Sequence, residues 1–416
     1  MLTGALAFAA FSLPVSAAGA QQAVIARHVT IREQADRHSG VVTYATPGEA
    51  ISLLDGGARD HGYYHVQLGD GRSGWVYQSF VDRTASVASA ATASDVANVY
   101  FINVDQANSA LLEFPCAAVL IDAGARDRAG IDHLTGFLEA FFARRADLNR
   151  HLAAVFITHT HVDHNRALKE VALRFHVDHY IHNGFQTGSG SANAKWMATY
   201  VQTQSPQIPS EAVEEGSVGP TGKTDANIDP VNCPRVDPDI RVLSGSYPDN
   251  PGWQDGDFDN QNNHSLVIKV TYGAARFLFT GDLEKPAIET LLDRPTIRPV
   301  LASDVWLVGH HGADNGTTAE LLAAMKPQVV IFSSGNPAVQ VKWTAWAYGH
   351  PRRSIVTMID HAVQRARSPA KDVLVADAVK KFTPYHLTHA LYDTAWDGDI
   401  HVTAKPNGTI TVKGSN

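Results

Sequence analysis

The sequence predicts an α/β protein in which a small all-β barrel precedes an αββα sandwich. Three observations lead to this fold class. Residues 23–83 contain short alternating strands separated by Gly/Asp turns, which is typical of a small barrel. From residue 98 onward, apolar strand-like runs alternate with helical patterns in two strand-rich halves, and this order favours layered sheets and helices. Several of these runs end in histidine or aspartate, so we expect a site at the strand ends.

Composition describes an ordinary globular protein and limits its partners. The chain has 416 residues, 44% hydrophobic and 18% charged, with a net charge of −8 and 20 histidines. Its length allows two or three domains. No long basic run is present, which argues against a dedicated duplex-DNA binder. A nuclease stays open, because metal ions in a site supply positive charge locally.

The first twenty residues predict a secretory signal peptide, 1–20. Leu2 to Ala20 is uncharged, contains an apolar core, and ends in Ala18-Gly19-Ala20, as cleaved leaders do. No other stretch is apolar enough to span a membrane, so we expect a periplasmic or secreted protein with no transmembrane domain in the mature chain. In that compartment Cys116 and Cys233 could form a disulfide, and two buried free thiols are the equal alternative.

Residues 23–83 resemble a bacterial SH3 domain. The matching features are the V-T-I-R strand at Val29–Arg32, the central Pro47-Gly48-Glu49, and the run Y-Y-H-V-Q-L-G-D-G-R-S-G-W-V from Tyr63. The resemblance implies a contact with peptidoglycan, and a stabilising barrel without a ligand is the alternative. Residues 84–97 are small and polar and are predicted to be a linker to the domain at 98–416.

The motif T-H-T-H-V-D-H-N at residues 158–165 predicts a metal site. It follows the apolar run Ala153–Ile157 and precedes a helical pattern. On an extended chain His159 and His161 point to one side, while Asp163 and His164 fall in the turn at the helix start. Imidazole and carboxylate groups bind divalent first-row metals. The spacing has room for two ions, one at each pair.

Later strand ends supply further candidates. Phe277–Asp282 is an apolar strand that ends in Gly-Asp, which makes Asp282 the candidate carboxylate between two metals. Another strand, from Val305, ends in His310 and His311, and the segment Y-G-H-P contains His350.

The chain from residue 98 resembles the metallo-β-lactamase superfamily, and within it the ComEC-type domain. The matching motifs are F-I-N-V-D-Q-A-N-S-A-L-L-E-F, L-I-D-A-G, H-T-H-V-D-H, N-N-H-S-L-V, L-F-T-G-D-L-E, V-G-H-H-G, S-S-G and Y-G-H-P. The implied metal ligands are His159, His161, Asp163, His164, Asp282 and His350. The implied catalytic residues are Asp163, His350 and His311, and the residues behind the ligands are Asp122, His310 and His264. His350 is preferred over His311 as the last ligand because of its distance beyond Asp282.

One segment departs from the wider superfamily. Where many members have a histidine ligand, this chain has Asp259-Asn260-Gln261-Asn262-Asn263-His264-Ser265. The first metal is therefore expected to lack a third imidazole unless His264 replaces it. The cofactor is expected to be one or two Zn²⁺ ions, with Mn²⁺ as an alternative.

The predicted function is an exported metal-dependent hydrolase that attacks a phosphodiester, as a nuclease or phosphodiesterase, with a metal-activated hydroxide. One alternative is a hydrolase of an envelope ester, amide or lactam that docks through the SH3-like domain. Another is a binding protein with a degenerate metal site. The substrate could accordingly be a small molecule, a nucleic acid or cell-wall material.

Overall fold

The structure is a computed structural model that describes residues 21–82 and 95–416. The chain divides into two compact units, Met1–Thr92 and Ala93–Asn416, and each is described by itself. The predicted signal peptide and most of the predicted linker lie outside the described residues. Within the described ranges, no helix combines the length and apolarity that a membrane crossing requires.

The first unit is an all-β domain built on one antiparallel sheet. Its strands are β1 (Gln21–Ile25), β2 (Val29–Arg32), β3 (Val41–Ala45), β4 (Ala50–Leu53), β5 (Arg59–Asp60), β6 (Tyr63–Leu68), β7 (Ser73–Tyr77) and β8 (Val81–Asp82). The order is β3-β2-β7-β6-β4-β1-β8, with β5 paired to β6. Alternate residues such as Ile31, Ile51 and Val66 are fully buried in its core, as the period of two requires.

The second unit contains two large sheets that pack face to face. One has the order β16-β15-β13-β11-β10-β9-β25-β26 and the other β17-β18-β19-β20-β21-β24. The first sheet comprises β9 (Ala97–Phe101), β10 (Ser109–Glu113), β11 (Ala118–Ala123), β13 (Ala154–Ile157), β15 (Tyr180–His182), β16 (Ser210–Ala212), β25 (Ile400–Ala404) and β26 (Ile410–Gly414). The second comprises β17 (Pro238–Ser244), β18 (Val267–Tyr272), β19 (Ala275–Phe279), β20 (Val305–Leu307), β21 (Val329–Phe332) and β24 (Leu391–Asp393).

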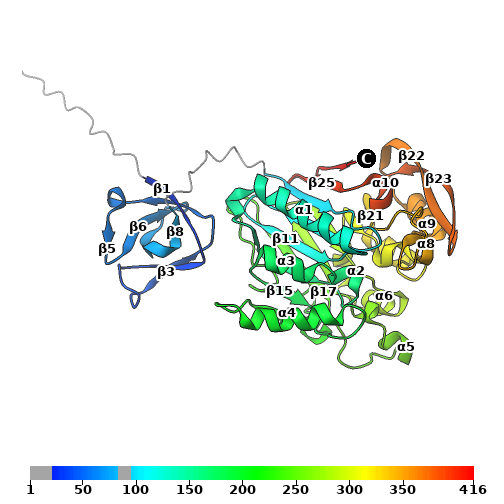
Figure 1. The fold of residues 1–416 in the computed structure, drawn as a ribbon, viewed down its shortest axis with the longest axis horizontal. Helices are drawn as coiled ribbons and strands as arrows, with labels where there is room; N and C mark the ends of the chain where they lie inside the picture. The colour runs from blue at the N-terminus through cyan, green and yellow to red at the C-terminus, as the bar shows by residue number, and fades with distance from the viewer. Residues whose placement is uncertain (1–20, 83–94) are drawn as a thin grey trace, which may run out of the picture. The chain divides into compact units, whose positions relative to one another are not determined.

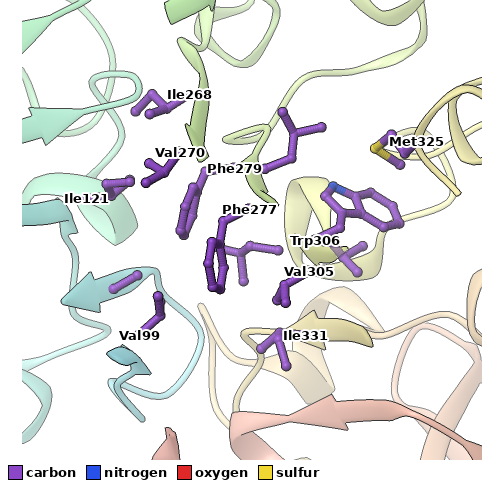
Figure 2. Close-up of a cluster of buried hydrophobic side chains, with 14 of the residues drawn as sticks. Val99, Ile121, Ile268, Val270, Phe277, Phe279, Val305, Trp306, Met325 and Ile331 are labelled. Atoms are coloured by element: carbon purple, nitrogen blue, oxygen red, sulfur yellow. The ribbon is translucent and has the colours of Figure 1, made fainter. Parts of the chain in front are cut away.

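The main core lies between these sheets, as Figure 2 shows. Val99 and Ile121 come from the first sheet, and Val270, Phe277 and Phe279 come from the second. All five side chains are almost completely buried. Burial of this kind contributes about 25 cal/mol per Å² of apolar surface, so the sandwich fixes the strand ends on which the site is built.

Helices cover the outer face of each sheet, which completes the predicted αββα order (Figure 1). A second core forms where α1 (Arg128–Arg144), α3 (Leu168–Arg174) and α4 (Ser191–Thr203) pack on the first sheet. Buried residues of α6 (Lys285–Leu292), α7 (Ala319–Met325) and α9 (Arg353–Ala362) join the main cluster from the second sheet's side. The short helices are α2 (Val162–Asn165), α5 (Asp255–Phe258), α8 (Ala345–Tyr348) and α10 (Thr394–Asp397).

Three features were open or missed in the sequence. Cys116 and Cys233 form a disulfide that joins residues 117 positions apart, which answers the question of their pairing. The strands β22 (Ala366–Ala378) and β23 (Lys381–His389) form a long separate hairpin. A further two-stranded sheet pairs β12 (His151–Leu152) with β14 (His176–Val177).

Candidate metal centre

The predicted site residues follow strands that run parallel and end at one edge of each sheet. In the first sheet β11 and β13 are parallel neighbours, and in the second β19, β20 and β21 are parallel neighbours. The motif at 158–165 follows β13, Asp282 follows β19, and His311 follows β20. Because the ends of parallel strands coincide, distant segments of the sequence converge on one place.

Four side chains form the group that we call the four-donor centre: Asp163, His164, Asp282 and His311. One ligand atom from each lies within 4.8 Å of the others. The His164 Nε2 atom is 3.1 Å from Asp282 Oδ1. The His311 Nε2 atom is 3.4 Å from Asp163 Oδ2 and 3.5 Å from Asp282 Oδ2. In the described part of the chain, this is the one such group of three or more donors.

The free atoms of this centre fit a divalent metal ion. His164 Nε2, Asp282 Oδ1 and His311 Nε2 are buried and have no hydrogen-bond partner of acceptable geometry among the described residues. Buried polar atoms normally have such partners. Two imidazoles and two carboxylates are ligands that zinc and manganese accept, so we identify the centre as a candidate metal site.

Hydrogen bonds on the far side of each imidazole leave the inner nitrogen available. His164 Nδ1 lies 2.7 Å from Asp122 Oδ2, and His311 Nδ1 lies 2.6 Å from the Ser333 carbonyl oxygen. A carbonyl oxygen can only accept, so the Nδ1 atom of His311 carries a proton and Nε2 is the nitrogen that can bind a metal once it is deprotonated. Partners of this kind orient ligands and increase their basicity. Asp122 therefore lies behind His164, on the side of the ring away from the centre.

Asp122 also connects the two strands of the first sheet that lead to the centre. Its carboxylate accepts hydrogen bonds from the Thr158 N–H, at 2.8 Å, and from the Thr158 hydroxyl, at 3.0 Å. Its backbone has a positive φ of 57°, which is uncommon for a residue other than glycine.

His159 and His161 form a second, smaller pair beside the centre. Their Nε2 and Nδ1 atoms face each other at 3.2 Å, in agreement with side chains that point to one side. The segment 259–265 was the place where a third histidine ligand was expected in the wider superfamily. There the hydroxyl of Ser265 lies 3.3 Å from His159 Nδ1. The same hydroxyl accepts the Asp282 N–H at 3.1 Å.

His264 does not supply the third imidazole. Its Nδ1 accepts the Tyr247 N–H at 3.2 Å, and its Nε2 lies 2.7 Å from the Phe258 carbonyl oxygen. Both ring nitrogens are thus used by the backbone. The ring also packs against aromatic side chains, including Phe185 and Trp253, so His264 supports the fold of its loop.

His350 lies beside the four-donor centre but is not a member of it. The Gly335 N–H donates to Gln106 Oε1 at 3.3 Å, which directs the amide nitrogen of Gln106 toward His350 Nδ1 at 3.1 Å. His350 Nδ1 is then an acceptor, and Nε2 carries the proton. The prediction ranked His350 above His311 as the last ligand, and the structure reverses this order. His310 lies next to both, with its Nδ1 3.1 Å from Asn315 Oδ1.

The carboxylates and imidazoles of the centre stabilise each other's charged forms. Burial opposes ionisation of Asp282, but His164 and His311 hold the pKa of its carboxyl well below the usual range. Burial also opposes protonation of His164, yet Asp282 and Asp122 raise the pKa of that imidazole well above its usual value. Burial and the neighbouring His310 and His311 lower the pKa of His350, so that ring is neutral at pH 7.

The loop Asp105–Asn108 forms backbone hydrogen bonds that stabilise the motif at residues 158–165. The Asn108 N–H donates to the Asp163 carbonyl oxygen at 2.8 Å, and the Asn108 carbonyl accepts the Gly124 N–H at 2.9 Å. Gly124 is required for this approach, since a Cβ atom there would lie 1.7 Å from the Asp163 carbonyl oxygen. The loop Asp105–Asn108 therefore has a clear structural role beside the motif.

A pocket of about 520 Å³ opens onto the centre. Its walls include residues that were not predicted as site residues, notably Arg126, Arg166, Trp343 and Tyr348. Tyr348 belongs to the Y-G-H-P motif and could have been found there. Trp343 lies five positions earlier in no recognisable pattern, so the sequence offered no signal for it.

Comparison with known proteins identifies the family. The profile of the metallo-beta-lactamase superfamily matches residues 102–335, which is more than half of the chain. The protein therefore belongs to this superfamily, as its motifs and its sandwich fold predicted.

Particular relatives support the ComEC-type resemblance. ComE operon protein 3 of Bacillus subtilis is 28% identical over 110 residues, which are 26% of this chain and 13% of that protein. Recombination protein 2 of Haemophilus influenzae is 36% identical over 89 residues, 21% of this chain and 10% of that protein. The matched region thus spans about a tenth of these relatives. Among solved structures, the metallo-beta-lactamase fold protein YhfI of Bacillus subtilis is 12% identical, with a TM-score of 0.34, covering 57% of this chain and 85% of that chain.

Proposed function

We propose that this protein is an exported, divalent-metal-dependent phosphodiesterase that acts on a nucleic acid or nucleotide. The observation that carries the proposal is the four-donor centre. Atoms of His164, Asp282 and His311 lack hydrogen-bond partners there among the described residues, and three of the four donors line a pocket with two arginines. A bound Zn²⁺ or Mn²⁺ would supply a Lewis acid there and would make water a better nucleophile near neutral pH.

The charge of the pocket favours a phosphodiester over a neutral ester or lactam. Arg126 is paired with Asp105 at 3.0 Å and also contacts Asp127. Arg166 donates its Nε–H to the Ala125 carbonyl at 2.8 Å, and no carboxylate in the described part of the chain forms an ion pair with it. A metal ion would neutralise the carboxylates of Asp163 and Asp282, so the remaining guanidinium charge suits an anionic substrate.

The chain's own residues have defined roles in this reaction. Asp163 lines the pocket as a carboxylate, because His311 and His164 outweigh burial and lower its pKa. It can orient an attacking water by accepting a hydrogen bond. His350 also lines the pocket and is neutral with its proton on Nε2. It can donate a hydrogen bond to a phosphoryl oxygen as negative charge develops.

Export is supported by the disulfide and by the predicted leader. A disulfide persists in oxidising compartments, and the Cys116–Cys233 bond joins two loops of the catalytic unit. The names of the relatives, a recombination protein and a protein of the ComE operon, favour nucleic acid as the substrate. A periplasmic or secreted location follows from this combination.

Turnover by the purified full chain tests the proposal. Protein loaded with Zn²⁺ or Mn²⁺ is incubated with bis(4-nitrophenyl) phosphate, single-stranded DNA, an aryl ester and a β-lactam. We expect hydrolysis of the two phosphodiesters, and its loss in Asp282→Asn. Asp304→Asn is the matched control, because Asp304 is also buried and ion-paired but to Arg276, away from the centre. Hydrolysis of the ester or lactam alone, or an active Asp282→Asn variant, contradicts the proposal.

A further inference from the structure

A row of aromatic rings leads from the four-donor centre to the rim of the pocket. The ring of His350 stacks on that of His311, with centroids 6.3 Å apart and planes at 18°. Tyr348 stacks on His350 at 5.6 Å and 17°. Trp343 follows, 6.2 Å from Tyr348 and tilted by 54°. The row thus begins at a candidate metal ligand and ends at an exposed indole.

Trp343 has an exposure and a backbone conformation that are unusual for a large aromatic residue. Trp343 is 70% exposed, whereas the other six tryptophans are buried or half-buried. Its backbone φ is +63°, a left-handed conformation that is an outlier for a bulky residue. Its indole N–H has no acceptor among the described residues. Local strain and an exposed apolar ring at a pocket are typical of a binding function rather than of folding.

The same pocket contains Arg166, whose guanidinium forms no ion pair with a carboxylate of the described residues. A ligand that satisfies both features has a flat ring for Trp343 and a negative group for Arg166. A nucleotide has both, because its base stacks on an aromatic side chain and its phosphate accepts hydrogen bonds from arginine.

We propose that Trp343, supported by Tyr348, is a stacking platform for a nucleobase of the substrate, and that Arg166 binds an adjacent phosphate. This inference rests on the proposed phosphodiester substrate and assigns it to single-stranded nucleic acid. Stacking needs an accessible base face, which a base pair inside a duplex does not present. Trp343 is therefore a specificity residue, while the four-donor centre acts on the scissile phosphate.

Binding measurements on the full chain distinguish the contribution of the nucleobase from that of the phosphate backbone. Fluorescence anisotropy is measured with a labelled oligothymidylate and with an abasic oligomer of the same length, each checked for intactness on a gel afterwards. We expect wild-type protein to prefer the oligothymidylate about tenfold, as one stacked base does. Trp343→Ala should abolish this preference and Trp343→Phe should keep most of it. Val341→Ala is the matched control, because Val341 is exposed nearby, at 57%, but does not line the pocket.

The variant Arg166→Gln tests the proposed phosphate contact independently of the base. It should weaken binding of both oligomers equally and reduce the salt dependence, because phosphates are common to the two. Equal affinity of wild-type protein for both oligomers, or a preference that survives Trp343→Ala, overturns the inference. Binding that follows the prediction without any metal-dependent turnover would instead contradict the proposed function and leave the platform standing.

Discussion

Replacing His311 by alanine should weaken metal binding strongly, whereas the same change at His350 should not. His311 Nε2 is one of the four inner donor atoms, within 3.5 Å of two carboxylate oxygens. His350 Nδ1 is engaged by Gln106 at 3.1 Å, and this ring is outside the donor group. The two substitutions remove the same chemical group from neighbouring positions, so they form a matched pair.

The magnitude follows from the number of donors. Four-ligand zinc sites in proteins bind with about 10–16 kcal/mol at neutral pH. One donor of four then contributes about 3 kcal/mol, which corresponds to about 100-fold in Kd. Loss of His350 leaves all four donors in place, so we expect a change below about tenfold, as for residues behind the ligands.

Competition with a fluorescent chelator measures both affinities on the full chain. Thermal unfolding of the metal-free variants shows whether the fold is kept, since both side chains are buried. His311→Gln is a further variant that fills most of the same space without an imidazole. If His350→Ala loses the metal and folded His311→Ala retains it, then the distance argument from the sequence is right and the geometric assignment is refuted.

Three other substitutions and the pH dependence of metal binding test the surroundings of the centre. Asp122→Asn should weaken metal binding by about 10- to 100-fold, because the amide lacks the negative charge and has one acceptor oxygen where the carboxylate uses both. An unchanged Kd in the chelator assay would rule out the orienting role. Gly124→Ala should destabilise the fold by about 3 kcal/mol or more in urea unfolding, because its Cβ would meet the Asp163 carbonyl at 1.7 Å. Gly136→Ala, in an exposed part of α1 with no atom within 4 Å, should instead stabilise it by about 1 kcal/mol. Metal affinity should rise as pH rises above about 6.5, because the pKa values of both imidazoles in the four-donor centre are raised and their protons must leave. The same raised pKa values stabilise the metal-free fold below pH 6.5 and lose that effect at higher pH; affinity that does not depend on pH between 6 and 8 would contradict the assignment.

Much of the fold and the central motif could be predicted because local patterns determine them. Short apolar runs such as Phe277–Phe279 indicate buried strands. The ends of neighbouring parallel strands meet at the same edge of a sheet. The positions of His159 and His161 followed from the alternation of side chains on an extended chain. The long β22–β23 hairpin was missed because most of its residues are not buried, so it lacks the apolar alternation that indicates a strand.

The choice between His311 and His350 could not be predicted because it depends on contacts between remote segments. Gln106 lies 244 positions before His350 and fixes its proton. His310 and His311 have consecutive positive φ values of 50° and 54°, and no local preference predicts two such residues in a row. Gly309 and Gly312 flank them, and Gly312 also has a positive φ of 81°. This tight turn places the ring of His311 in the centre and that of His310 at the edge of the pocket.

The four donors come equally from the two halves of the sandwich. Asp163 and His164 follow β13 of the first sheet, while Asp282 and His311 follow β19 and β20 of the second. A metal ion bound by all four would therefore connect the two sheets at their common edge, in addition to the apolar core between them. Any free energy of metal binding then also stabilises the packing of the sheets, at about 4 kcal/mol when the ion exceeds its Kd a thousandfold. The left-handed conformations of His310 and His311 cost about 1–2 kcal/mol each. The free energy of metal binding would offset this cost in the metal-bound protein.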